Sequence, residues 1–115
     1  MVNRIVVGAH YGLRDWLLQR ISAIVMALYS VAFLLCFLPR LPLHFEEWHA
    51  WFAHPVGKIA TLLFMLSLLL HAWVGVRDIF MDYIKPFGLR FSLQVLVILL
   101  LLVYALWAVA LLWSI

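Results

Sequence analysis

The chain has 115 residues, of which 69% are hydrophobic and only 11% are charged, whereas soluble globular domains carry about 25% charged residues. A chain this short buries only part of its surface when it folds, so this composition excludes a soluble domain and also a disordered chain. The net charge of +3 does not indicate a nucleic-acid partner, because the basic residues flank the apolar segments. The single cysteine, Cys36, excludes a disulfide within the chain.

Three segments of 18, 18 and 25 residues contain no Asp, Glu, Lys or Arg: Ile21–Leu38, Ile59–Val76 and Phe91–Ile115. At about 1.5 Å per residue, even a helix of about 18 residues approaches the ~30 Å hydrocarbon thickness of a bilayer. In lipid each segment must satisfy its backbone hydrogen bonds internally, which a helix does. We therefore predict an all-α membrane protein with three transmembrane helices. We expect a single membrane domain over residues 1–115 and no cleavable signal peptide.

Helix I is predicted over about residues 16–38, since Gly8 and Gly12 disfavour a helix before it and Pro39 ends it. Asp15 is then a suitable N-cap or first-turn acid. Residues 44–54 follow, with Phe45, Trp48 and Phe52 at positions i, i+3 and i+7. This spacing predicts a short amphipathic helix at the membrane interface, where tryptophan is enriched.

Helix II is predicted over about residues 55–80, because proline at position 55 suits a first helical turn. Helix III is predicted over about residues 89–113, after a connector that contains Pro86 and Gly88. Six basic residues lie in the N-terminal flank and the second connector, and two lie in the first connector. The positive-inside rule then predicts a cytoplasmic N-terminus and a C-terminus on the outer side of the membrane, which is the periplasmic side if the source is a bacterium.

His71 is the one ionisable side chain deep within a predicted span, and such residues are costly in lipid and mark functional sites. Ser67 and Gly75 lie one turn away on either side. The serine could orient the imidazole or form a hydrogen bond back to its own helix, and the glycine leaves a groove for a flat group. One interpretation is an axial haem ligand, with the thioether of Met26 or Met65 as a conceivable second ligand. The alternative is a histidine hydrogen-bonded to a neighbouring helix.

Other polar residues near the predicted spans also allow two interpretations each. Arg20 could clamp a haem propionate or extend to lipid phosphates. Tyr83, beside Asp82, could donate a hydrogen bond to a quinone carbonyl or simply anchor the helix at the interface. The remaining histidines lie in the flanks, and the spacing of three of them does not favour a metal site: His44, His49 and His54.

The stretch from His71 to Pro86, HAWVGVRDIFMDYIKP, closely resembles the corresponding segment of the hydrophobic membrane anchor of bacterial succinate dehydrogenases. The shared pattern is His-Ala-Trp, an apolar residue and Gly, followed by Asp-Tyr, an apolar residue and Lys-Pro. A second similarity places Asp15, Arg20 and Ala23 at the start of helix I. The length and the three spans agree as well, so the resemblance covers essentially the whole chain.

This resemblance implies that His71 is an axial ligand to the iron of a b-type haem, which the chain shares with a sister anchor subunit. It implies that Arg20 lies near the propionates, and that Tyr83 hydrogen-bonds ubiquinone with Asp82 beside it. It also implies an iron–sulfur subunit and a flavoprotein subunit on the cytoplasmic face, which carry the iron–sulfur clusters and the FAD.

The resemblance therefore predicts a non-catalytic anchor in the bacterial inner membrane, within a complex that passes electrons from succinate to ubiquinone in the tricarboxylic acid cycle. The alternative function is a haem-free structural anchor or assembly subunit, similar to some fumarate reductase anchors.

Overall fold

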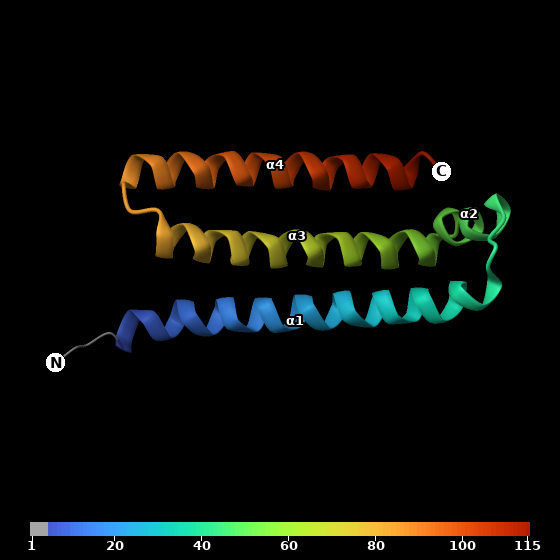
Figure 1. Cartoon of the computed structure of the whole chain (residues 1–115), viewed down its shortest axis with the longest axis horizontal. Helices are drawn as coiled ribbons and strands as arrows, with labels where there is room; N and C mark the ends of the chain where they lie inside the picture. The colour runs from blue at the N-terminus through green and yellow to red at the C-terminus, as the bar shows by residue number, and fades with distance from the viewer. Residues whose placement is uncertain (1–4) are drawn as a thin grey trace.

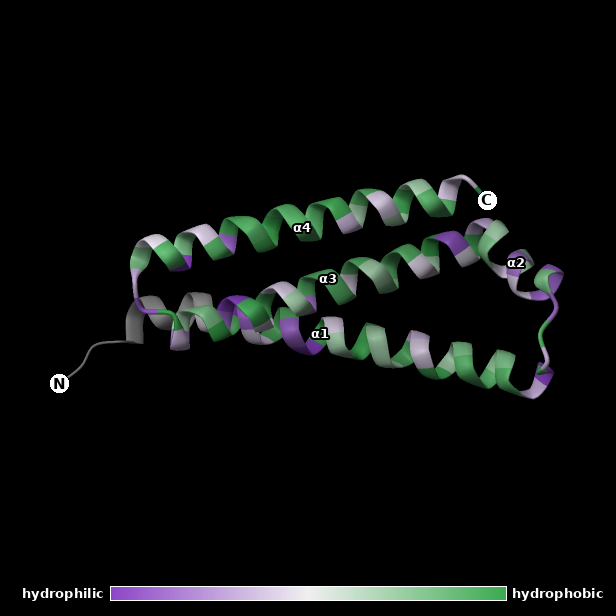
Figure 2. Ribbon diagram, turned by 45° about the horizontal axis from the view of Figure 1, so that its top comes forward, coloured by the Kyte–Doolittle hydropathy of each residue, from purple (hydrophilic) through white to green (hydrophobic). Residues whose placement is uncertain are grey.

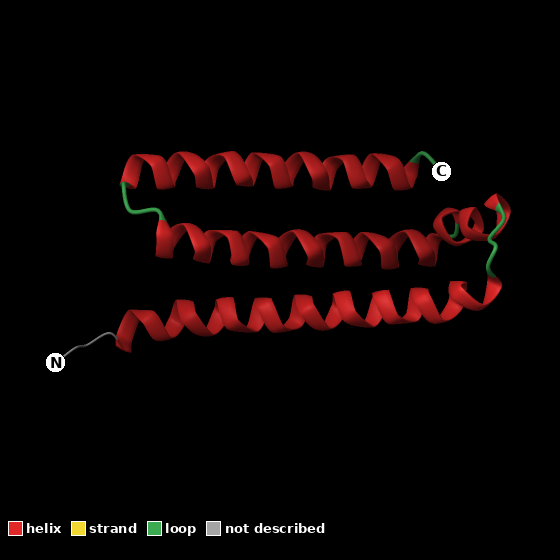
Figure 3. Ribbon diagram, in the orientation of Figure 1, coloured by secondary structure: helices red, strands yellow, loops and turns green. Residues whose placement is uncertain are grey.

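The computed structural model describes residues 5–115 of the chain, and these residues are almost entirely helical. The elements in chain order are α1 (Ile5–Phe37), the 3₁₀ turn η1 (Leu38–Arg40), α2 (Phe45–Ala53), α3 (Pro55–Tyr83) and α4 (Phe87–Trp113). Only short loops join them (Figure 3). Three of the helices, α1, α3 and α4, are long and apolar enough to cross a membrane, which confirms the predicted class and number of spans.

The three long helices lie side by side, with α3 between α1 and α4 (Figure 1). The short helix α2 lies at the end of the bundle where α3 begins, and it packs on α3. The start of α1 and the end of α4 are therefore at opposite ends of the molecule. Figure 2 shows the hydrophobic colour along α4 and the middle of the other long helices, with hydrophilic segments toward their ends.

The predicted interfacial helix is present as α2 and is bounded by His44 and His54. Its aromatic residues form a continuous row: the rings of Phe45 and Trp48 are 5.7 Å apart, and those of Trp48 and Phe52 are 5.6 Å apart. Phe52 in turn lies 6.2 Å from Phe33 of α1. The i, i+3 and i+7 spacing in the sequence thus places these aromatic side chains on one face of α2, and the last of them packs against α1.

The predicted start of helix I is wrong. The helix α1 begins at Ile5 and not near Asp15 or Trp16, and Gly12 lies within it. An isolated glycine costs about 1 kcal/mol in a helix interior, and structural context routinely overrides a propensity of this size. Asp15 is therefore an interior helical residue and not an N-cap, and its carboxylate has a partner on another helix.

Smaller differences occur at the second connector. The helix α3 continues to Tyr83, three residues beyond the predicted end, and α4 begins at Phe87. Asp82 and Tyr83 thus belong to the last turn of α3. Proline at position 86 still separates the two helices, because it serves as the N-cap residue of α4.

The helix interfaces use small side chains, because membrane helices associate through close packing and interhelical hydrogen bonds. Few side chains are buried within the described part of the chain, and several of the buried residues are small: Ser22, Gly57, Ser67, Val74 and Ala108. Most large apolar side chains are exposed on the outer surface of the bundle. Such a surface suits lipid or further helices.

Gly57 sets the closest approach between α2 and α3. A Cβ atom at this buried position would lie 1.7 Å from the carbonyl oxygen of Trp51, so the backbone itself would have to move. At Gly12, by contrast, an added Cβ meets no atom within 4 Å. Only glycine fits at position 57 in this structure.

We expect Gly57→Ala to destabilise the protein by about 1–3 kcal/mol through overpacking, and Gly12→Ala to be neutral or stabilising. Both changes add the same methyl group and the same helix propensity, so their difference isolates the contact with Trp51. The measurement is the thermal unfolding midpoint of the purified protein in detergent. Equal midpoints for the two variants would contradict the proposed close contact.

Candidate functional site

His71 faces α1 across the α1–α3 interface. Its Nδ1 lies 3.2 Å from the hydroxyl oxygen of Ser22, and that hydroxyl donates to the backbone carbonyl of Gln19 at 3.1 Å. When Ser22 directs its one proton to Gln19, its oxygen can accept a hydrogen bond from an N–H at Nδ1 of His71. In that arrangement Nε2 is the ring nitrogen left without a partner from Ser22. Ser22 is buried, with 4% of its surface exposed, so this bond is shielded from competing solvent.

Ser22, and not Ser67, is the serine that contacts the imidazole. Ser67 is buried, but the hydrogen-bond partner of His71 comes from α1 and not from one turn earlier on α3. At Gly75, one turn after His71, an added Cβ would lie 3.9 Å from the side-chain amide nitrogen of Gln19, an ordinary van der Waals distance. Gly75 therefore faces α1 across the same interface with room for a methyl group, and the groove for a flat group stays a prediction.

Arg20 lies on a different face of α1 from Ser22, because side chains two positions apart in a helix point in directions that differ by about 200°. Its side chain is exposed, and the guanidinium lies 5.3 Å from the centre of the Trp16 ring. Along the helix axis it is only about 3 Å from Ser22. Arg20 and His71 thus lie at a similar depth, but the described contacts do not join them directly.

An ion pair joins α1 and α3 between His71 and the end of the bundle where α1 begins and α3 ends. Arg77 donates through its Nη2 to the carboxylate of Asp15, and it lies 3.4 Å from Asp78. Both members of the first pair are partly buried, with 23% and 30% of their side chains exposed. Two buried atoms nearby, Nε of Arg77 and Oε1 of Gln19, have no hydrogen-bond partner among the described residues. Polar groups therefore line the α1–α3 interface from Asp15 to His71.

Tyr83 and Asp82 are at the end of α3, about 18 Å along the helix axis from His71 at the usual rise per residue. Tyr83 has 76% of its surface exposed, and Asp82 is also exposed. Neither side chain takes part in a hydrogen bond with the described part of the chain. The phenol is consequently available to a ligand or to another subunit, and the structure does not place it beside His71.

The opposite end of the bundle holds a second polar group that the sequence analysis did not single out. The hydroxyl of Tyr29 on α1 lies 2.6 Å from that of Thr61 on α3, and the indole N–H of Trp51 on α2 donates to Tyr29 at 3.3 Å. Three helices are joined by these two hydrogen bonds.

The flank histidines near this end have structural contacts. His54 accepts a hydrogen bond from the backbone N–H of Val56 and so caps α3, and the ring of His49 lies 4.8 Å from that of Phe45. Among the side chains from residue 12 onward, no three His, Cys, Asp or Glu residues gather where they could hold a metal ion. The side chain of His10 lies outside the described residues.

Sequence reasoning missed Ser22, Thr61 and the pairing of Asp15 with Arg77. One usable signal was depth in the membrane. Ser22 follows the start of helix I and His71 precedes the end of helix II, and in antiparallel helices these two ends lie on the same side of the membrane. Opposite charges at matching helix ends were a similar signal for Asp15 and Arg77. Neither signal gives the rotation of the two helices, so neither identifies the contact by itself.

These features define a helical, multi-pass membrane anchor with a polar interface between two of its spans. The family described as "Succinate dehydrogenase/Fumarate reductase transmembrane subunit" matches residues 3–113. The chain is 43% identical over 102 residues to the succinate dehydrogenase hydrophobic membrane anchor subunit of Coxiella burnetii, with 89% of each chain covered. The corresponding protein of Rickettsia conorii is 32% identical over 91 residues, which cover 78% of this chain and 72% of the relative.

The chain therefore belongs to the transmembrane subunit family of succinate dehydrogenases and fumarate reductases. This confirms the resemblance seen in the stretch from His71 to Pro86. The protein is a multi-pass membrane anchor that associates with such a complex.

Proposed function

We propose that this chain supplies one axial ligand, His71, to a b-type haem and forms part of a ubiquinone site in a succinate dehydrogenase complex. The observation that carries the proposal is the hydrogen bond between Nδ1 of His71 and Ser22. Metal-binding histidines typically donate their second ring N–H to an acceptor, which fixes the tautomer and leaves the other nitrogen for the metal. The contact of Nδ1 with Ser22 fits an axial ligand, because it leaves Nε2 of His71 as the nitrogen that could bind the haem iron.

A haem bound there would supply one-electron chemistry, and the residues of this chain would position it. Gly75 has room beside it for at least a methyl group, and small residues of this kind let other groups approach a membrane helix closely. Arg20 is exposed at a depth close to that of His71, and a guanidinium can pair with a propionate through two hydrogen bonds. We assign Arg20 the propionate role on these grounds.

Tyr83 is proposed to donate its O–H to a carbonyl oxygen of ubiquinone. Reduction of a quinone increases the negative charge on its oxygens, and a hydrogen-bond donor stabilises that charge most where it develops. The exposure of Tyr83 leaves the phenol free for this contact. Asp82, its exposed neighbour on α3, lies near enough in sequence to influence the orientation of the phenol or to carry protons.

The remaining parts of the proposed machinery belong to other chains of the complex. The sister anchor subunit would provide the second axial ligand. An iron–sulfur subunit and a flavoprotein subunit would dock on the cytoplasmic face and hold the iron–sulfur clusters and the FAD. This chain would then have no catalytic residue of its own, and it would lie in the bacterial inner membrane with its N-terminus in the cytoplasm.

A haem-free structural anchor is the second candidate, because the same Ser22–His71 bond also stabilises a helix pair. Interhelical hydrogen bonds of this kind contribute about 0.6–2 kcal/mol. The test is to purify the complex in detergent, record its absorbance spectrum and identify the chains that co-purify by mass spectrometry. We expect the absorbance bands of a b-type haem after reduction with dithionite, and we expect a second small hydrophobic chain to co-purify. A complex that contains all of its chains but lacks the absorbance bands of a b-type haem would support the haem-free anchor instead.

A further inference from the structure

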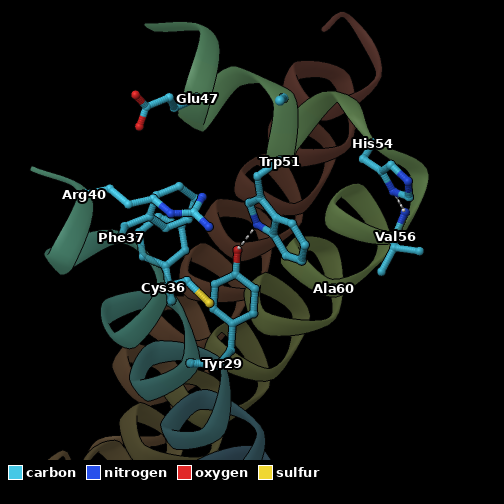
Figure 4. A pocket seen from close by; sticks show the side chains of 12 residues that line it. Tyr29, Cys36, Phe37, Arg40, Glu47, Trp51, His54, Val56 and Ala60 are labelled. Atoms are coloured by element: carbon cyan, nitrogen blue, oxygen red, sulfur yellow. Dashed lines mark hydrogen bonds between the residues drawn. The ribbon is translucent and has the colours of Figure 1, made fainter. Parts of the chain in front are cut away.

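A cleft of about 700 Å³ opens at the α2 end of the bundle, opposite the end that carries Tyr83. Its walls come from the last turns of α1, from η1, from α2 and from the first turns of α3 (Figure 4). The cleft shares no lining residue with the polar interface around His71. It is therefore a separate feature of the chain.

The cleft combines an apolar wall with two opposite charges at its rim. The α1 wall includes Ala32, Phe33 and Phe37, which lie within the charge-free segment that ends at Leu38. Arg40 lies two residues beyond that segment, on η1, and Glu47 is the lining residue of α2 that carries a negative charge (Figure 4). The change from apolar wall to charged rim matches the change from hydrocarbon to headgroups at a membrane surface.

The polar atoms of the inner wall are already paired. Trp51 donates to Tyr29, and Tyr29 is bonded to Thr61. By contrast, Arg40 and Glu47 take part in no ion pair and no side-chain hydrogen bond within the described part of the chain. The cleft thus presents one cation and one anion to a ligand, on walls that the three-helix hydrogen bonds hold together.

We propose that this cleft binds one phospholipid with a phosphoethanolamine headgroup. Its phosphate pairs with the Arg40 guanidinium, which suits phosphate oxygens, and its ammonium donates hydrogen bonds to the Glu47 carboxylate. One acyl chain lies along the apolar wall of α1. An anionic headgroup without the ammonium leaves Glu47 facing a negative charge, and a choline headgroup has no N–H to donate. Charge complementarity therefore selects the zwitterion with a primary ammonium.

The first experiment measures lipid retention by native mass spectrometry. The purified complex is delipidated in detergent and offered equal amounts of phosphatidylethanolamine, phosphatidylcholine and phosphatidylglycerol. We expect one phosphatidylethanolamine to be retained in preference to the other two. Glu47→Gln should lower its preference over phosphatidylcholine by about tenfold, and Arg40→Gln should lower retention of all three lipids by about tenfold.

Two matched controls make the same chemical changes outside the cleft. Glu46→Gln neutralises the exposed neighbour of Glu47 on α2, and Arg14→Gln neutralises an exposed arginine at the other end of α1. Both should leave retention unchanged. Equal retention of the three lipids, or equal effects of cleft and control variants, overturns the proposal.

A second experiment uses Cys36, the single cysteine of the chain, which lines the cleft and is exposed. The delipidated complex is labelled there with a photoreactive maleimide, supplied with phosphatidylethanolamine and illuminated. We expect a lipid adduct on this chain. A cross-link to another polypeptide, or a Cys36 that the maleimide cannot reach, shows that a protein covers the cleft and overturns the proposal.

Discussion

His71→Ala is expected to remove the b-type haem from the purified complex. Loss of hydrogen bonds around a metal ligand costs about 10- to 100-fold in affinity, so loss of the ligand itself should exceed about 100-fold. The measurement is the dithionite-reduced absorbance spectrum together with the haem content per complex. His44→Ala is a suitable control, because His44 is exposed at the N-cap of α2 and its side chain caps nothing.

Ser22→Ala tests how much the orientation of the imidazole contributes to haem binding when the ligand itself is still present. This variant removes the acceptor for His71 Nδ1 while it leaves Nε2 intact. We expect haem to remain bound at saturation, with an affinity lower by up to about 100-fold and a shifted midpoint potential. A complex of His71→Ala with unchanged haem spectrum and content would falsify the ligand assignment, whatever the behaviour of Ser22→Ala.

Tyr83→Phe is expected to slow ubiquinone reduction by about 10- to 100-fold, which is the effect of losing one hydrogen bond to a charge-bearing oxygen. Succinate oxidation with a soluble artificial acceptor should be unchanged, because that assay does not use the membrane site. The two activities of the same preparation are compared. Tyr83 is exposed at the end of α3, so removal of its hydroxyl should not disturb packing.

Tyr104→Phe is the matched control for this change. Tyr104 is also exposed, but it lies on α4 and outside the proposed site. We expect it to leave both activities intact. If Tyr83→Phe lowers both activities to the same extent, the variant has impaired assembly, and the proposed role of the phenol in quinone reduction is wrong.

Prediction from the sequence was successful where a local pattern decides the outcome. The charge-free segments gave the three spans, Pro55 marked the first turn of α3, and the aromatic spacing gave α2. It was wrong at the start of α1, where Gly8 and Gly12 were given too much weight. Continuation of an existing helix adds a hydrogen bond for each residue, so isolated glycines do not end it.

The candidate site was partly accessible to the same reasoning. His71 stood out because an ionisable group is costly within a span, and Tyr83 and Asp82 stood out through the motif that contains them. The sequence offers Ser67, one turn away on the same helix, as one candidate partner of His71, whereas the structure provides Ser22 from α1. The sequence also suggests Asp15 as an N-cap or first-turn acid of helix I, whereas Asp15 forms an ion pair with Arg77 of α3.

The sequence by itself determined that this protein crosses a membrane three times as helices, because backbone groups in lipid must find their hydrogen bonds within the same segment. Only the tertiary structure decided which polar side chains meet: Ser22 with His71, Asp15 with Arg77, and Tyr29 with Thr61 and Trp51. These contacts join residues that are 22 to 62 positions apart. They depend on how each helix is rotated about its axis against its neighbour, and side-chain packing across the interface sets that rotation.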